Sequence, residues 1–180
     1  MKKNHKTFTL RKLIVCAMLA ALAIILDRFV PITFTESLKV TLTFVPVVVA
    51  ASFYGPVEGA VVWGIADLLG ALMFPRGAYF PGFTVTSAIK GALFGIFLHT
   101  LREKMHVVPR VTIPTVINNF IIGLVIDTFW ISILYDSNSY LGYFVSRIPQ
   151  FIIISVMNVV IIMILEKILP SIKKYAPEVG

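Results

Sequence analysis

Four ionisable residues interrupt or border the long apolar segments of this 180-residue chain, namely Asp67, Lys90, Asp127 and Arg147. Helical spacing places aromatic and polar side chains on the same faces: Trp63 and Phe74 with Asp67, Phe83 and Phe94 with Lys90, Asn119 and Trp130 with Asp127, and Phe151 and Asn158 with Arg147. Aromatic walls around a few polar groups are typical of a pocket for a flat organic ligand. We therefore expect these faces to line one binding site.

A purely structural role is the alternative for three of these charges. Charged side chains inside a bilayer are costly, and they occur where they pair with one another or face a ligand path. Asp67, Lys90 and Asp127 would then pair to hold the helices together. The two interpretations overlap, because a charge that serves a pocket also needs a partner when no ligand is bound.

The composition indicates a membrane protein. Hydrophobic residues make up 58% of the chain and charged residues only 14%, with a mean hydropathy of +0.91. A soluble domain is about 45–50% apolar and about 25% charged, so the excess apolar surface must face lipid. The net charge of +7 is spread along the chain, which fits membrane topology better than nucleic-acid binding.

Six apolar stretches approach the length of about 20 residues that a membrane helix needs. The predicted spans are 10–26, 38–54, 57–74, 83–101, 111–134 and 143–169, the last of which is expected to end at Pro170. They leave no room for a separate soluble domain. We predict a single domain over 1–180, an all-α integral membrane bundle of six transmembrane helices.

Lysine and arginine in the short connections predict the orientation of the bundle. Most of the 16 cations fall in the N-terminal tail, the 102–110 loop and the C-terminal part, which puts both termini in the cytoplasm. The first span is expected to stay uncleaved, since its apolar run continues past the triplet 21–23. At a rise of about 1.5 Å per residue, Asp67, Lys90 and Asp127 then lie about 10 Å from the outer ends of their helices. This clustering predicts a cavity that is open to the outside and closed below.

Two further segments indicate contacts. The connection 75–82, PRGAYFPG, has prolines and glycines that shape a defined loop, and a plain outer connection needs no arginine, so we expect it to cover a ligand. The alternative is a connector with interfacial aromatics.

Ala17 and Ala21 have the spacing that lets helices approach closely in lipid, and their partner is either another helix of the chain or another subunit.

Motifs of enzymes and metal sites are absent from the sequence. There is no GxxxxGK[ST] phosphate loop, no HExxH and no GxSxG. Cys16 is the single cysteine, which excludes an intrachain disulfide and a cysteine zinc site. We expect no catalytic residues, no metal and no cofactor. Without an ATP-binding motif, uphill transport would need energy from another protein.

Three stretches are distinctive together: AMLAALAIIL in the first span, FYGPVEGAVVWGIADLLGALMFPRGAYFPGFT over 53–84, and DTFWISILY over 127–135 followed by Arg147. They resemble the substrate-binding S components of energy-coupling factor (ECF) vitamin transporters, most closely the folate-specific branch. The resemblance covers nearly the whole chain. The central run is the specific part, because the alanine pattern is shared across S components.

This resemblance implies a six-helix vitamin-binding protein of the bacterial plasma membrane. S components associate with a transmembrane scaffold subunit and two cytoplasmic ATPases, and the family's alanine motif, here Ala17 and Ala21, contacts the scaffold. The vitamin binds near the outer surface, and the S component is thought to topple to carry it inward. The expected ligand is folate or a reduced folate. The alternatives are another vitamin (pantothenate or a queuosine precursor), a small membrane enzyme acting on lipids, or an accessory protein without a ligand.

The residue types suit folate. A pterin edge carries two N–H groups that a carboxylate can accept in a bidentate way, for which Asp67 is the first candidate and Asp127 the second. Candidates for flat apolar walls are Trp63, Tyr79, Phe80, Phe83 and Trp130; candidates for the cations that bind the glutamate tail are Lys39, Arg76, Lys90 and Arg147. The family's fifth-helix segment reads more like NTLW, so the additional acid Asp127 is expected to alter the ligand or to pair with Lys90.

Overall fold

The computed structural model describes residues 10–35, 38–75, 77–135 and 140–175, with the backbone alone for 32–35, 38–40 and 172–175. Its elements are α1 (Leu10–Arg28), β1 (Ile32–Thr35), β2 (Leu38–Val40), α2 (Phe44–Tyr54), α3 (Pro56–Met73), α4 (Pro81–Gly95), η1 (Ile96–Thr100), α5 (Val107–Val116), η2 (Ile117–Ile126), α6 (Asp127–Tyr135) and α7 (Tyr140–Tyr175). The segments η1 and η2 are π-helical and continue the α-helices beside them. Apart from one short β-ribbon the described chain is helical, which confirms the predicted all-α class.

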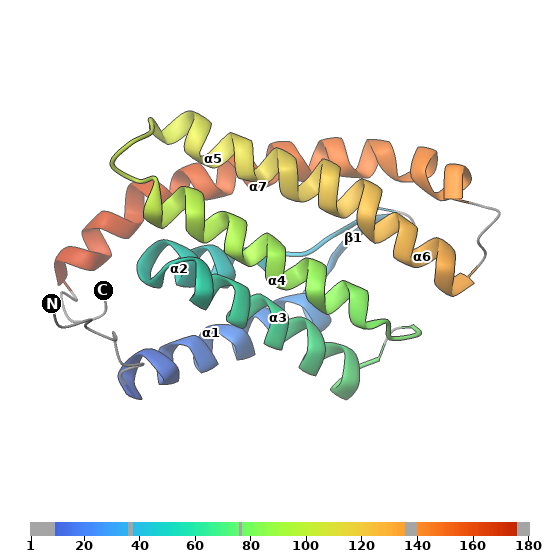
Figure 1. Ribbon diagram of the computed structural model, residues 1–180, viewed down its shortest axis with the longest axis horizontal. Coiled ribbons are helices and arrows are strands. Elements are labelled where there is room, and N and C mark those ends of the chain that lie inside the picture. The colour runs from blue at the N-terminus through green and yellow to red at the C-terminus, as the bar shows by residue number, and fades with distance from the viewer. Residues whose placement is uncertain (1–9, 36–37, 76, 136–139, 176–180) are drawn as a thin grey trace, which may run out of the picture.

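The helices run lengthwise in one bundle (Figure 1). In that view α5, α6 and α7 lie along one side, α1 and α3 along the other, and α4 with α2 between them. The start of α1 and the end of α7 lie at one end of the bundle, which we call the terminal end. The end of α3, the start of α4, the end of α6 and the start of α7 lie at the other, and we call it the hairpin end because the β-ribbon lies on that side of the bundle.

Glycines allow α3 and α4 to pack closely. A Cβ atom added at Gly59 would lie 2.5 Å from the carbonyl oxygen of Gly91, which is far inside van der Waals contact. The turn before α3 also needs glycine, because Gly55 has a φ of 112°, and Pro56 then begins the helix. The close crossing places the helix of Asp67 directly beside that of Lys90.

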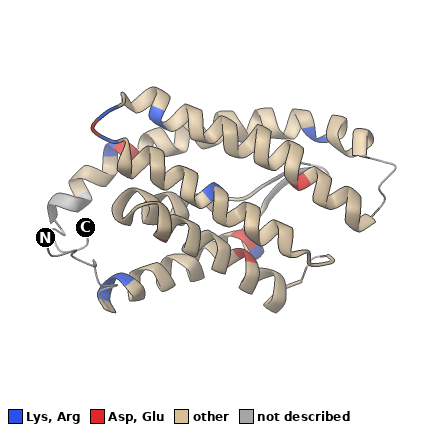
Figure 2. Cartoon of the chain, in the orientation of Figure 1, with Lys and Arg blue, Asp and Glu red and all other residues tan. Residues whose placement is uncertain are grey.

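Much of the apolar surface faces outward. Four helical stretches are long and apolar enough to cross a bilayer: Pro56–Met73, Pro81–Thr100, Val107–Tyr135 and Tyr140–Ser171. In an apolar 18-residue window of each stretch only 22–33% of the residues are buried, and Figure 2 shows few charged positions along the helices. Apolar side chains that the bundle does not bury are stable in lipid, so the structure indicates a membrane protein.

The second predicted span was wrong at its start. Residues 38–40 form strand β2, which pairs antiparallel with β1 through Ile32↔Val40 and Thr33↔Lys39. The β-branched residues of ITFT and LKV favour a strand over a helix, and hydropathy alone does not separate the two. The helix begins only at Phe44, and its 11 residues are about 16 Å long, about half the thickness of a bilayer core.

Two prolines lie inside α7 instead of ending it. We expected the sixth span to end at Pro170, but α7 includes both Pro149 and Pro170 and continues to Tyr175. A proline removes one hydrogen bond and kinks a helix, and contacts with neighbouring helices can hold the kinked helix together. In α5, Pro114 lies three residues before η2, so a wider helical turn follows the missing donor.

A second group of charges is buried at the terminal end of the bundle. Arg110 is 5% exposed and forms an ion pair with Glu166, which is also 5% exposed. Ser52 donates a hydrogen bond to Glu166 at 3.2 Å, and Arg110 donates to the carbonyl of Arg102 at 2.7 Å. These contacts join α2, α5 and α7.

Candidate functional site

Three cavities follow one another from the hairpin end into the bundle. The outer pocket, of about 210 Å³, is lined by Arg28, Asp67, Ala71, Gly77, Ala78, Tyr79 and Phe83. The middle pocket, of about 120 Å³, is lined by Ala23, Asp27, Thr41, Thr43, Trp63, Ala66 and Asp67. The inner chamber, of about 140 Å³, is lined by Thr41, Thr43, Phe44, Trp63, Lys90, Asn118, Asn119, Phe151, Ile154 and Asn158. Because neighbouring cavities share lining residues, we describe them as one candidate site.

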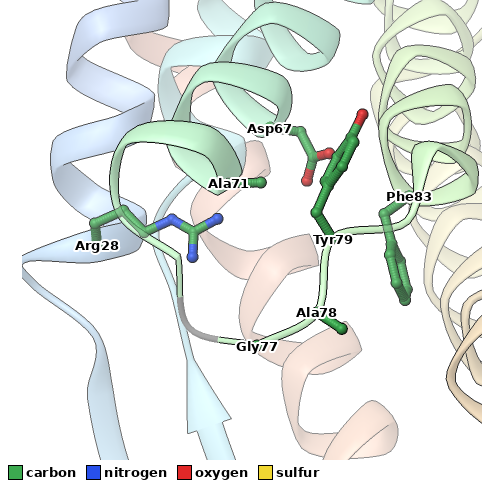
Figure 3. Close-up of a pocket in the computed structure, with 7 residues that line it drawn as sticks. All are labelled: Arg28, Asp67, Ala71, Gly77, Ala78, Tyr79 and Phe83. Atoms are coloured by element: carbon green, nitrogen blue, oxygen red, sulfur yellow. The ribbon is translucent and has the colours of Figure 1, made fainter. Parts of the chain in front are cut away.

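Asp67 lies where the outer and middle pockets meet. Figure 3 shows its carboxylate beside the ring of Tyr79, with Arg28 reaching the pocket from the other side. Thr84 donates a hydrogen bond to Asp67 Oδ2 at 2.8 Å, and the Thr84 and Tyr79 hydroxyls are 3.0 Å apart. Asp67 makes no salt bridge within the described part of the chain, so its carboxylate can still accept hydrogen bonds from a ligand.

Lys90 and Asp127 are bound to each other. Lys90 Nζ is 2.5 Å from Asp127 Oδ2, and Thr86 donates to Asp127 Oδ1 at 2.7 Å. Both oxygens of Asp127 therefore have partners inside the protein. The expected pairing of the additional acid with Lys90 is confirmed, whereas Asp67 takes no part in it.

Arg147 has no comparable partner. It donates a hydrogen bond to Thr128 Oγ1 at 2.9 Å, and its guanidinium lies 5.1 Å from the centre of the Phe151 ring. None of the described carboxylates is within ion-pair distance. Since Phe151 lines the inner chamber, Arg147 is a cation with spare hydrogen-bonding capacity at the edge of the site.

The inner chamber contains an amide that the sequence analysis missed. Asn118 Nδ2 donates to the carbonyl of Lys90 at 3.1 Å, while Asn119 Nδ2 donates to Ser155 Oγ at 2.9 Å. An α-helix turns successive side chains about 100° apart, so spacing selected Asn119 alone. The π-helical segment η2 has a wider turn, and both asparagines line the chamber. The sequence signal that could have indicated this π-helical turn is Pro114, which lies shortly before the pair Asn118 and Asn119.

The aromatic candidates divide into two groups. Trp63 stacks on Phe94 with 6.1 Å between ring centres and lines the middle pocket and the chamber. Tyr79 and Phe83 line the outer pocket. Phe80 and Trp130 do not line any of the three cavities; they pack on each other at 5.1 Å, and Phe80 contacts Phe83 edge-on at 6.5 Å.

Two predicted cations cannot be placed. Arg76 lies outside the described residues, and of Lys39 the structure describes the backbone alone, in strand β2. The described residues include no group of three His, Cys, Asp or Glu side chains that could hold a metal ion.

The α1 residues predicted to meet a partner face outward. Ala17 and Ala21 are exposed, whereas Cys16, Ala20 and Ala23 are buried against the bundle. The exposed alanines line an apolar groove of about 210 Å³ together with Val61, Ile65 and Leu69 of α3. They are thus available to another molecule.

Known proteins are similar to this chain in sequence and in fold. Residues 11–166 match the family described as ECF transporter, substrate-specific component. The chain is 31% identical over 122 residues to the folate transporter FolT of Clostridium novyi (strain NT), covering 68% of this chain and 69% of that protein. It is 31% identical over 144 residues to the folate transporter FolT of Leuconostoc mesenteroides subsp. mesenteroides, covering 77% and 75% of the two chains.

A solved structure has the same fold. The crystal structure of FolT bound with folic acid matches this one with a TM-score of 0.75 and 26% sequence identity, over 88% of this chain and 96% of that one. The resemblance to S components, most closely to folate transporters, is confirmed, and the family consists of substrate-binding components of transporters rather than enzymes. The chain belongs to the family of substrate-specific components of ECF transporters.

Proposed function

We propose that this protein is the folate-binding subunit of an ATP-driven ECF uptake transporter in a bacterial plasma membrane. The observation that carries the proposal is its structural likeness to FolT with folic acid bound. Two relatives named as folate transporters support the same ligand. The sequence contains no ATP-binding motif, so energy for uptake must come from another protein. Membership of the ECF transporter family implies that this partner is a transmembrane scaffold subunit with two cytoplasmic ATPases.

The proposed topology has six membrane-embedded helices in one domain over 1–180. The four long spans, α1 and the short α2 make up this set, with the π-helical segments continuing their neighbours. Both termini are cytoplasmic, so the hairpin end with its cavities faces the outside. An alkylation test at cysteines introduced beside the termini measures this orientation directly.

The proposed binding site combines the predicted residues in three roles. Asp67 accepts N–H groups of the ligand. Trp63, Tyr79 and Phe83 form flat walls, which Phe80 and Trp130 support from behind. Arg147, with Lys39 and Arg76, binds the glutamate tail, while Lys90 and Asp127 border the site as an ion pair.

Replacing Asp67 by asparagine is expected to weaken folic acid binding at least tenfold, about 1.4 kcal/mol. Asparagine has a similar size, but it removes the negative charge and presents N–H groups where the ligand needs an acceptor. Calorimetric titration of the detergent-solubilised protein measures the affinity. Glu103→Gln, an exposed carboxylate far from the cavities, serves as the control. An unchanged affinity for Asp67→Asn would remove Asp67 from the site.

Replacing Ala17 by tryptophan is expected to lower folate uptake at least tenfold while leaving folic acid binding unchanged. The indole fills the apolar groove beside Ala17, which we propose as the surface that meets the scaffold, and a gain of volume at a close helix contact is strongly unfavourable. Uptake of labelled folic acid by cells that also produce the scaffold and ATPases measures the effect. Met18→Trp, at a neighbouring position 67% exposed, should transport normally; normal uptake by Ala17→Trp would show that docking uses another face.

A further inference from the structure

The first helix, α1, packs on the bundle through small side chains. Its buried residues are Cys16, Ala20 and Ala23, whose spacing places them on one face that we call the inner stripe. Small side chains let helices approach closely, but they do not interlock as larger ones do. The outward side is also apolar, with Met18 67% and Leu22 44% exposed. Because lipid tails are as apolar as these residues, the bilayer does not determine which side of α1 faces the bundle.

Charged residues lie only at the two ends of this helix, Arg11 and Lys12 at its start and Asp27 and Arg28 at its end (Figure 2). Lys12 lies four residues before the inner stripe and Asp27 four residues after it, so both extend the same face of the helix. Polar contacts at its ends can therefore fix the rotation of α1, which the apolar middle of the helix leaves open.

Two other helices hold Lys12 at the terminal end. Its ammonium group forms an ion pair with Glu58 of α3, a residue that is 7% exposed, and lies 5.4 Å from the centre of the Tyr54 ring of α2. Glu58 is in the first turn of α3, where the helix dipole favours a negative charge. A cation between a buried carboxylate and an aromatic face has few alternative positions. The contact therefore fixes the start of α1 against α2 and α3.

The attachment of α1 at the hairpin end is weaker. Thr43 donates a hydrogen bond to Asp27 Oδ1 at 3.4 Å, which is longer than the usual range for such a bond. The Arg28 side chain packs on Gly70 of α3, where an added Cβ atom would lie 3.2 Å from Arg28 Nε. Among the contacts that the described residues make, the ion pair of Lys12 is thus the stronger attachment of α1.

The two attachments enclose the apolar groove between α1 and α3. The α3 wall of the groove, within residues 61–69, lies between Glu58 and Gly70, the two positions of α3 that hold α1. Successive residues of a helix are about 100° apart, so a rotation of α1 by that angle would move Met18 into the position of Ala17. A long side chain there would keep a second helix at a distance. The shape of the groove therefore depends on the rotation of α1.

We propose that Lys12 and Glu58 are positioning residues for docking: their ion pair fixes the rotation of α1 and so keeps Ala17 in the groove that accepts a helix of the scaffold subunit. This inference rests on the proposed function, which supplies the scaffold as the partner. Neither residue lines any of the three cavities of the candidate site. Removal of the ion pair should therefore weaken docking and leave folic acid binding unchanged.

The test measures how the detergent-solubilised protein binds the purified complex of scaffold and ATPases, alongside its affinity for folic acid. Lys12→Met is expected to weaken docking about tenfold or more, while the affinity for folic acid stays within about twofold. Lys12→Arg retains the positive charge and the ion pair, so it should dock normally. Arg11→Met removes the neighbouring cation, which is exposed, and should also dock normally.

A matched pair of variants distinguishes positioning from general stability. Glu58→Gln and Glu166→Gln each remove the charge of one buried carboxylate that pairs with a cation at the terminal end, so both should lower the melting temperature. Only Glu58→Gln should weaken docking, because Glu166 joins α7 to α5 and α2 rather than to α1. Equal losses of docking in the two variants would overturn the inference, since docking would then follow stability alone.

The remaining outcomes separate this inference from the proposed function. Normal docking by Lys12→Met would overturn the positioning role alone, and so would an equal loss of docking and of folic acid affinity, because the variant would then disturb the whole bundle. Failure of the unaltered protein to bind both folic acid and the complex would overturn the proposed function and this inference with it. If Lys12→Met does not fold, the two glutamine variants decide the question, and normal docking by Glu58→Gln would equally overturn the role.

Discussion

Replacing Glu166 by alanine is expected to lower the free energy of unfolding by about 3–5 kcal/mol. Its carboxylate is buried at the terminal end, where it pairs with Arg110 and accepts a hydrogen bond from Ser52. Without this carboxylate the Arg110 guanidinium remains buried with no counter-charge, and the desolvation of that charge is no longer compensated. Unfolding in mixed micelles with increasing denaturing detergent measures the change.

The double variant Arg110→Met with Glu166→Leu should recover most of that loss. Both charges are then replaced by apolar groups of similar volume, which is often neutral in stability. Glu103→Ala removes an exposed carboxylate from the same end of the molecule and should change stability by less than about 0.5 kcal/mol. A Glu166→Ala protein as stable as this control would mean that the pair does not hold α2, α5 and α7 together.

Replacing Asp127 by leucine is expected to destabilise the protein by about 3 kcal/mol, because Lys90 loses its counter-ion in a mostly buried position. Adding Lys90→Met should restore most of the stability. The double variant also separates the two roles that the sequence left open for these charges. If the pair only supports the bundle, the double variant binds folic acid as the unaltered protein does; a loss of tenfold or more would show that one of the two charges contacts the ligand.

The helices around the outer pocket were predictable because their ends carry local signals. Gly55 and Pro56 begin α3, while Pro75 and Pro81 enclose the connection to α4, so those boundaries agree to within two residues. Such residues act through their own backbone geometry. At 38–43 no breaker separates strand from helix, and the pairing of β2 with β1 decides the structure there. That pairing is a contact between segments, which hydropathy does not encode.

The site was predictable in its types of residue but not in its arrangement. Helical spacing placed Trp63 and Asp67 on one face, and they line the same pocket. Asn118 was missed because η2 departs from α-helical spacing. The ion pair Arg110–Glu166 joins residues 56 positions apart. The periodicity of a single sequence indicates which residues share a helix face, but it does not predict contacts between distant helices. The long-range ion pairs, which only the structure shows, identify the charges that support the bundle. The charges without such a partner, Asp67 and Arg147, remain available to a ligand.

Titration of the unaltered, detergent-solubilised protein with folic acid, followed by tryptophan fluorescence, tests folate recognition most directly. Trp63 lines the inner chamber, so folic acid should quench the signal saturably at micromolar or lower concentration with a stoichiometry of one to one. Trp63→Phe should remove most of the quench, and pantothenate or a queuosine precursor should leave the fluorescence unchanged. Absence of quenching and of binding heat at micromolar folic acid, or saturable binding of another vitamin instead, would contradict folate as the ligand.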